Sequence, residues 1–182
     1  MKSNLAQALA YIDEDEGPEV NISPDEPGGS SCHGVTMDVL REYCASHSFS
    51  APTIIDMKAM TSELAGTIFT WRFLDPLRFN ELPSGVDYRM ADAAITLGRT
   101  GACLALQMAL AMWPVTGVMD DVTIAAIKAE DPKLVISVLD AAWIVWKHGM
   151  TSDGWAKYGH GWTERCSRVR DRTRAMIAAN VN

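Results

Sequence analysis

Residues 5–18 read Leu-Ala-Gln-Ala-Leu-Ala-Tyr-Ile-Asp-Glu-Asp-Glu-Gly-Pro, and this stretch shows how the chain is built. Its leucine and isoleucine residues recur at the spacing of one helical face, which predicts a first helix over residues 4–15. Gly17-Pro18 ends that helix, because proline cannot continue the hydrogen-bond ladder and restricts the residue before it. An acidic helix end followed by a sharp break is therefore expected at Glu16.

Helical patterns continue to the C-terminus, and strand-like alternation is almost absent apart from a small hairpin that the segment between Glu19 and Val35 allows. We therefore predict a mainly α fold. A length of 182 residues suits one domain, or two small helical halves that share a core. Further helices are expected after Thr36 and over residues 52–59, 61–73, 86–97, 102–112, 122–130, 133–147 and 163–179.

The composition is that of a soluble globular protein, with 48% hydrophobic and 21% charged residues. The most apolar stretch, residues 102–115, contains Gln107 and Pro114 and is shorter than the roughly 20 residues that cross a bilayer. The N-terminal residues lack the pattern of a secretory signal. We expect synthesis in the cytoplasm and no membrane insertion.

Charge is distributed unevenly along the chain. The net charge of −7 argues against nucleic acid as a partner. Residues 1–31 hold seven acids against Lys2 alone, whereas residues 157–176 hold six cations against two acids. The basic segment would either contact an anionic polymer or form the solvated face of a terminal helix.

The cysteines are scattered, and no close CxxC pair occurs, so we expect thiols rather than disulfides in a reducing compartment. Cys32 and His33 could combine with Cys44 and His47 as zinc ligands. This spacing matches no common zinc finger, and adjacent residues are awkward ligands for one metal. We predict no metal and no cofactor.

Glu16 is the candidate catalytic acid. At the C-terminal end of a helix, the partial negative charge of the helix dipole disfavours a charged carboxylate. Asp13 and Asp15 add like-charge repulsion. A general acid needs a protonated carboxyl group, which this position favours. The alternative is an acidic helix end that is simply exposed to water.

Three segments that follow in order carry a family resemblance: Glu16-Gly17-Pro18, Asp25-Glu26-Pro27-Gly28-Gly29 and Gly34-Val35-Thr36. Together they resemble the start of glycoside hydrolase family 108, which includes phage endolysins and secretion-activator-type muramidases. The resemblance continues through Phe73–Leu77, Leu82–Val86, Asp92–Ala94, Leu106–Leu110, Gly117–Asp120 and Tyr158–Trp162. The sequence departs from the family in having Pro18 in place of a glycine and Glu19 in place of an aromatic residue. It also has Phe73-Leu74 in place of Tyr-Trp, and Ile95-Thr96 where the family has an asparagine after Asp-Ala-Ala.

The resemblance implies a lysozyme-like helical bundle with a small hairpin after the first helix. Residues 1–84 would form the catalytic half and residues 85–182 a helical peptidoglycan-binding-like half, packed into one globule. The implied reaction is hydrolysis of the β-1,4 bond between N-acetylmuramic acid and N-acetylglucosamine, with Glu16 as general acid.

The second carboxylate is either Asp25 or Glu26. Spacing from Glu16 selects Asp25, whereas alignment on the following Pro-Gly-Gly selects Glu26, which we prefer slightly because the glycine turn fixes local geometry. Thr36 would orient a water molecule or, more simply, cap the second helix. The residues expected to contact the substrate are Asn21, Ser31, His33, Asp92, Thr96 and Trp162.

The full expectation is a monomeric endolysin that acts on bacterial peptidoglycan. It would be made in the host cytoplasm and reach the periplasm and wall after a holin opens the membrane. A non-catalytic peptidoglycan-binding or secretion-accessory protein of the same fold is the alternative from another functional class. A lytic transglycosylase is the alternative among enzymes, because it needs only the acid.

Overall fold

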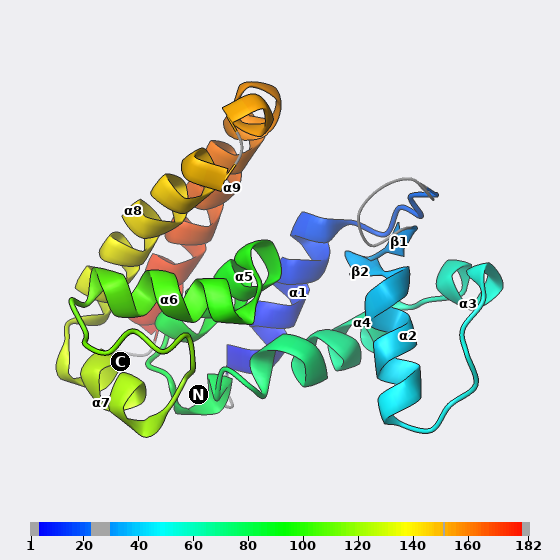
Figure 1. Cartoon of the computed structure of the whole chain (residues 1–182), viewed down its shortest axis with the longest axis horizontal. Helices are drawn as coiled ribbons and strands as arrows, with labels where there is room; N and C mark the ends of the chain where they lie inside the picture. Colours follow the sequence, from blue (N-terminus) through cyan, green and yellow to red (C-terminus); the bar gives the residue numbers. More distant parts are fainter. Residues whose placement is uncertain (1–3, 23–29, 151, 180–182) are drawn as a thin grey trace. The chain divides into compact units, whose positions relative to one another are not determined.

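The computed structural model describes residues 4–22, 30–150 and 152–179 (Figure 1). The chain divides into two compact units. The N-terminal unit comprises Ala6–Asp75, and the C-terminal unit comprises Met1–Leu5 together with Pro76–Asn182.

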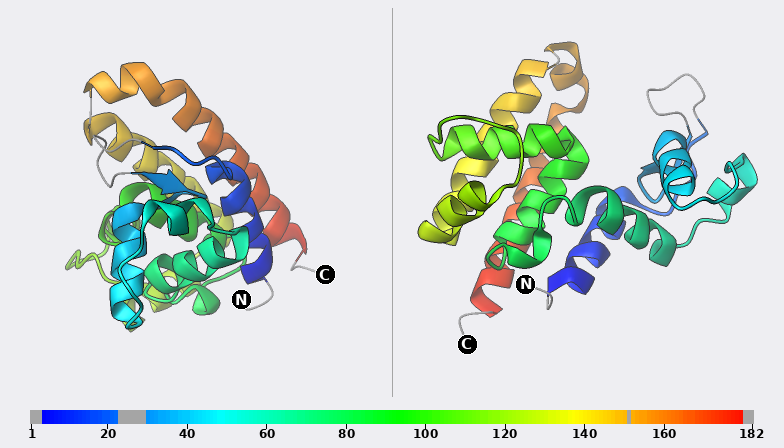
Figure 2. Two further views of the ribbon diagram at one scale, coloured as in Figure 1. Left: turned by 90° about the vertical axis from the view of Figure 1, so that its right-hand side faces the viewer. Right: turned by 60° about the horizontal axis from the view of Figure 1, so that its bottom comes forward.

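The N-terminal unit consists of short helices and one small hairpin (Figure 2). Threonine side chains start three of its helices, because Thr36, Thr53 and Thr61 each accept a hydrogen bond from a backbone N–H of the first turn. Its elements are α1 (Leu5–Glu16), β1 (Ser31–Cys32), β2 (Val35–Thr36), α2 (Met37–Ser46), α3 (Ile54–Lys58), α4 (Ser62–Phe69) and the π-helical continuation η2 (Thr70–Leu74).

The C-terminal unit is a helical bundle around α5. Every residue from Val86 to Ala94 is buried, and α8 and α9 run side by side along the unit (Figures 1 and 2). Its elements are the 3₁₀ turn η3 (Phe79–Glu81), α5 (Val86–Leu97), α6 (Arg99–Ala109), α7 (Asp121–Ala129), α8 (Pro132–Met150) and α9 (Ser152–Ala179).

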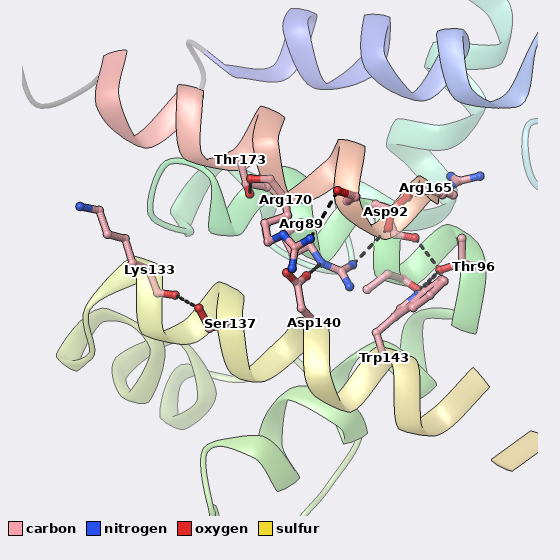
Figure 3. Close-up of polar contacts among 12 residues, drawn as sticks. Arg89, Asp92, Thr96, Lys133, Ser137, Asp140, Trp143, Arg165, Arg170 and Thr173 are labelled. Atoms are coloured by element: carbon pink, nitrogen blue, oxygen red, sulfur yellow. Dashed lines mark hydrogen bonds and ion pairs between the residues drawn. The ribbon is translucent and has the colours of Figure 1, made fainter. Parts of the chain in front are cut away.

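Ion pairs lie inside this bundle, where three helices meet (Figure 3). Arg89 of α5 is fully buried, and its Nε donates to Asp140 of α8 at 2.6 Å. Its Nη1 donates to Asp92 at 3.1 Å, and Asp92 also accepts from Arg165 of α9 at 2.8 Å. Two cations therefore face two carboxylates, so the cluster carries no net charge. Such balance is needed because an unpaired charge in a protein interior is very costly.

The predicted mainly α class, with a small hairpin after the first helix, is confirmed. Two predicted helix starts were too late. α6 begins at Arg99 rather than residue 102, and α9 begins at Ser152 rather than residue 163. In α9 the ring of Trp155 packs over Gly159, where a Cβ would lie 2.9 Å from the ring. Ring contacts of Trp162 with Trp155 and Tyr158 also support the helix across Gly159 and Gly161, which lie before the predicted start.

Within the described residues, no helix combines the length and the apolar character that crossing a bilayer requires. All four cysteines are free thiols; Cys32, Cys103 and Cys166 are buried, and Cys44 is half-buried. Burial raises the pKa of Cys103 to about 11, so this thiol stays neutral at physiological pH.

Replacing Arg89 tests the ion cluster. We expect Arg89→Leu to lower the free energy of unfolding by about 3–5 kcal/mol, because it leaves buried carboxylates without a counter-charge. Urea denaturation followed by circular dichroism measures this loss. Lys128→Ala, which removes an exposed cation of α7, should change the unfolding free energy by less than about 0.5 kcal/mol. Equal losses in the two variants would contradict a structural role for the cluster.

Candidate functional site

A two-residue turn joins β1 to β2 in the N-terminal unit. The strands pair with Cys32 opposite Val35, and His33 and Gly34 form the turn. Both turn residues have positive φ, +47° for His33 and +72° for Gly34. Two successive positive φ values are the signature of a type I′ turn, whose twist matches that of the flanking strands. Glycine adopts this conformation without steric cost, whereas histidine adopts it only rarely.

Glu16 lies beneath this turn. It is the last residue of α1, which ends because Gly17 has a φ of +73° and donates its N–H to the carbonyl of Asp13 at 2.9 Å. A Cβ at Gly34 would lie only 2.6 Å from Cγ of Glu16 and 2.8 Å from its Oε2. Oε1 of Glu16 is shielded from solvent. The missing side chain at Gly34 therefore lets backbone cover the candidate acid.

Asp13, one helical turn before Glu16, fixes the hairpin turn in place. Nδ1 of the buried His33 lies 2.6 Å from Oδ1 of Asp13. Because a carboxylate only accepts, this contact places the imidazole proton on Nδ1. The other carboxylate oxygen of Asp13 accepts a hydrogen bond from the hydroxyl of Ser62 at the start of α4. Three elements that are distant in sequence thus meet at one carboxylate.

Three further predicted site residues lie on or beside the hairpin. Asn21 and Ser31 exchange two backbone hydrogen bonds of 2.9 Å, which attach the chain after α1 to β1. Thr36 is the N-cap of α2, since its Oγ1 accepts from the N–H of Val39 at 3.3 Å. Capping was the simpler of the two roles predicted for Thr36. Its hydroxyl proton remains able to donate to another acceptor.

An open groove of about 610 Å³ lies in the same unit. Trp71 lines this groove. Its ring stands edge-on to the rings of Tyr43 and His47, with centroid-to-centroid distances of 5.4 and 5.7 Å. Asp13 lines the groove and also binds His33, so it links the groove to the hairpin turn. Glu16 does not line the groove. The lining residues are Ala6, Leu9, Ala10, Asp13, His47, Ser62, Glu63, Ala65, Gly66, Thr67, Phe69, Thr70, Trp71 and Asp75.

The predicted contacts Asp92, Thr96 and Trp162 belong to the C-terminal unit. Asp92 is 3% exposed and held by two arginines, so direct contact with a sugar would require the ion cluster to open. Thr96 accepts a hydrogen bond from the indole N–H of Trp143 at 2.8 Å. Trp162 is half-buried, and its ring lies 4.9 Å from Nζ of Lys147. Burial, followed by the charge of Arg165, lowers the pKa of Lys147.

The two candidates for the second carboxylate, Asp25 and Glu26, lie outside the described residues. In the described part of the chain, no three His, Cys, Asp or Glu side chains are gathered as a metal site would require. His33 and Cys32, once considered as zinc ligands, instead serve the hairpin. His33 binds Asp13, and the thiol of Cys32 lies 3.7 Å from the carbonyl oxygen of Pro18.

The roles of Asp13, Ser62 and Trp71 were not predicted from the sequence. Asp13 was expected only to add charge near Glu16, although it faces the hairpin one turn earlier on the helix. A signal for the turn was present, because His33-Gly34 lies between two short segments able to pair as strands. No local pattern indicates that Ser62 would reach Asp13, because 49 residues separate them.

The family model described as glycosyl hydrolase 108 matches residues 9–98. Through these residues the chain belongs to the glycosyl hydrolase 108 family. The match spans the end of α1, the hairpin and the groove. No curated protein matches the chain.

A solved structure supports the same relationship along the length of the chain. The chain is similar to SagA of Brucella abortus, with 29% sequence identity and a TM-score of 0.83. The similarity covers 97% of each chain. The C-terminal unit of this glycosyl hydrolase 108 member, which lies mostly beyond the family match, therefore has a structural counterpart as well.

Gly34 offers a direct test of the covered acid. We expect Gly34→Ala to lower the free energy of unfolding by about 2–4 kcal/mol, because it combines a left-handed conformation with overlap on Glu16. Gly17→Ala is the matched control, since Gly17 has a similar φ of +73° at the end of α1, and its added Cβ would meet only the flexible end of the Glu19 side chain. That variant should cost only about 1 kcal/mol. Urea denaturation of both proteins decides, and equal costs would argue against close packing at Glu16.

Proposed function

We propose that this glycosyl hydrolase 108 member is a muramidase that cleaves the β-1,4 bond between N-acetylmuramic acid and N-acetylglucosamine in peptidoglycan. Glu16 is the general acid. The observation that carries the proposal is the packing of Gly34 on Glu16, which covers a carboxyl group at a helix end inside the region of the family match.

Glycosidic cleavage needs a proton on the leaving oxygen while positive charge develops on the sugar ring. Covering Glu16 with backbone limits the access of water, so the carboxyl group can transfer its proton to a bound substrate rather than to solvent. The contact between Asp13 and His33 holds the cover in place. In this mechanism Glu16 donates the proton, and Asp13 and His33 are positioning residues.

The groove of the N-terminal unit supplies the kinds of group that bind sugars. The ring of Trp71 offers an apolar face, and the carboxylates of Glu63 and Asp75 can accept hydrogen bonds from hydroxyl groups. A mostly apolar groove with a few convergent polar groups is typical of a ligand site. We propose that it binds the glycan strand next to the bond that is cut.

A second carboxylate would stabilise the developing charge or activate water, and we assign this role to Glu26, with Asp25 as the competing choice. Thr36 would orient the water through its hydroxyl proton while still capping α2. Asn21 and Ser31 would contact the sugar near the hairpin, whereas the buried His33 would act through Asp13. Asp92 and Thr96 would act through the C-terminal unit, and Trp162 would offer its ring.

The proposed biological role is that of a monomeric endolysin made in the cytoplasm. Its substrate lies in the cell wall, so the enzyme would depend on a holin to pass the membrane. The amount of wall released by purified protein added from outside, compared with that released from intact cells that express it, measures this dependence.

Glu16→Gln tests the acid. We expect a 10²–10⁴-fold loss of kcat, because the amide keeps the size of the side chain but cannot donate a proton as a carboxylic acid does. Digestion of purified peptidoglycan followed by mass spectrometry of the sugar ends measures the loss. Glu14→Gln, in the same acidic run but exposed, should retain full activity.

The products separate the alternatives in that experiment. Reducing N-acetylmuramic ends support the muramidase, whereas 1,6-anhydro ends would identify a lytic transglycosylase. Equal behaviour of wild type and Glu16→Gln, with binding retained, would identify a non-catalytic wall-binding protein. Parallel Asp25→Asn and Glu26→Gln variants assign the second carboxylate.

Removal of the Asp13–His33 contact tests whether these two residues hold the hairpin turn in place over Glu16. We expect Asp13→Asn to lower kcat about tenfold and to leave KM unchanged. The loss of kcat corresponds to an increase of about 1.4 kcal/mol in the activation free energy. His33→Asn should do the same, and the double variant should lose no more than either single variant, because both remove one interaction. Asp15→Asn is the control for loss of an acidic charge on the same helix. Additive losses, or a change confined to KM, would contradict the positioning role.

A further inference from the structure

A groove runs along the face that α8 and α9 share in the C-terminal unit. It has two adjoining compartments of about 680 and 500 Å³, which share Ser137, Arg170 and Arg174. Figure 3 shows Lys133 and Ser137 on α8 and Arg170 on α9. The first compartment is also lined by Lys133, Ile136, Ile177 and Ala178, and the second by Asp140, Ala141, Ile144, Val145, Thr163 and Cys166.

Three cations line this groove: Lys133, Arg170 and Arg174. In the described part of the chain, none of the three side chains forms a salt bridge with a carboxylate. Among the described residues, the guanidinium of Arg170 donates one long hydrogen bond, 3.4 Å from the hydroxyl of Ser167. The positive charge of the groove is therefore available to a ligand.

Asp140 is the acid among the described lining residues, and its charge is already balanced. It is 7% exposed and accepts a hydrogen bond from the buried Arg89 at 2.6 Å. Asp92 and Arg165 complete a cluster of two carboxylates and two guanidinium groups. The three lining cations are thus in excess, which gives the groove a field that attracts anions.

The walls between the cations are apolar or carry small hydroxyl groups. Ile136, Ile177, Ile144 and Val145 present methyl groups, and Ser137 and Thr163 present hydroxyls. Lys133 and Ser137 lie four residues apart on α8, as do Arg170 and Arg174 on α9, so each pair shares one helix face. An elongated groove with separated cations and methyl-lined walls suits a short peptide with several carboxylates better than a compact phosphate ion.

We propose that this groove binds the peptide stem that peptidoglycan carries on its muramic acid. The carboxylates of the stem would pair with Lys133, Arg170 and Arg174, and its alanine methyl groups would pack on the apolar walls. This assignment rests on the proposed function, because it takes peptidoglycan to be the substrate. It names a second site, in the C-terminal unit, for a part of the substrate that Glu16 does not cut.

The test is calorimetric titration of the full chain with free L-alanyl-γ-D-glutamyl-diaminopimelate. We expect saturable binding to wild type, and binding at least tenfold weaker to the variant that combines Arg170→Gln with Arg174→Gln. The control combines Arg41→Gln with Lys128→Gln, two exposed cations outside the groove, and should bind as wild type does. Thermal unfolding of each variant establishes that all are folded.

Two further probes identify the chemistry that is recognised. The same tripeptide with its carboxylates amidated should bind at least tenfold more weakly than the free acid. Inorganic phosphate at equal ionic strength should neither bind measurably nor displace the tripeptide. Equal binding of the amidated peptide, stronger binding of phosphate, or no difference between the two double variants would each overturn the proposal.

Glycan strands freed of their peptides keep this test separate from the test of the proposed function. If the groove assignment alone is wrong, wild type still cleaves the bare strands and binds no tripeptide. If the proposed hydrolysis is wrong, no strand is cleaved whatever the tripeptide does. With both correct, loss of the groove cations should raise KM for intact peptidoglycan and leave cleavage of bare strands unchanged.

Discussion

The close approach of Gly34 to Glu16 is the constraint on which the N-terminal unit depends. It requires the helix to end at Glu16, a turn of two left-handed residues above it, and a glycine at the second turn position. Each requirement is a backbone matter, met by Gly17 and Gly34 rather than by a side-chain interaction. Asp13 then binds His33 and makes the turn part of the helix end. The geometry around the acid is thus built mainly from main chain, which moves less than side chains do.

In the C-terminal unit, side-chain ion pairs, rather than backbone contacts, are a main feature of the interior. Where α5, α8 and α9 meet, two arginines and two aspartates form one ion cluster, so the charges within that cluster cancel. The surface of the unit between α8 and α9 holds cations that are not cancelled. Because this cluster is neutral, it adds little to the field at the surface, which is set by the surface residues. The recognition properties of this surface can therefore change without disturbing the fold beneath it.

The sequence predicted the helices well and the contacts of the site only in part. Periodic apolar residues and the break at Gly17-Pro18 predicted α1 within one residue, because both signals are local. The predicted start of α9 was too late. Gly159 and Gly161 weaken the helical pattern in the sequence, whereas the packing of Trp155 on Gly159 sustains the helix in the structure. Ser62 could not be placed beside Asp13, since that contact exists only after distant segments have packed. Glu16 was singled out by its position and its motif, but its cover by Gly34 is a tertiary feature.

The side chains that join α1, the hairpin and α4 at Asp13 become available at different times during synthesis of the chain. Asp13 and His33 leave the ribosome well before Ser62, which supplies the last of the three side chains. A growing chain that stops short of α4 has the acidic helix and the turn but lacks the third support. The order of translation therefore makes assembly of this corner a late event in the N-terminal unit. A truncated chain would carry every residue of the acid motif without the framework that holds it.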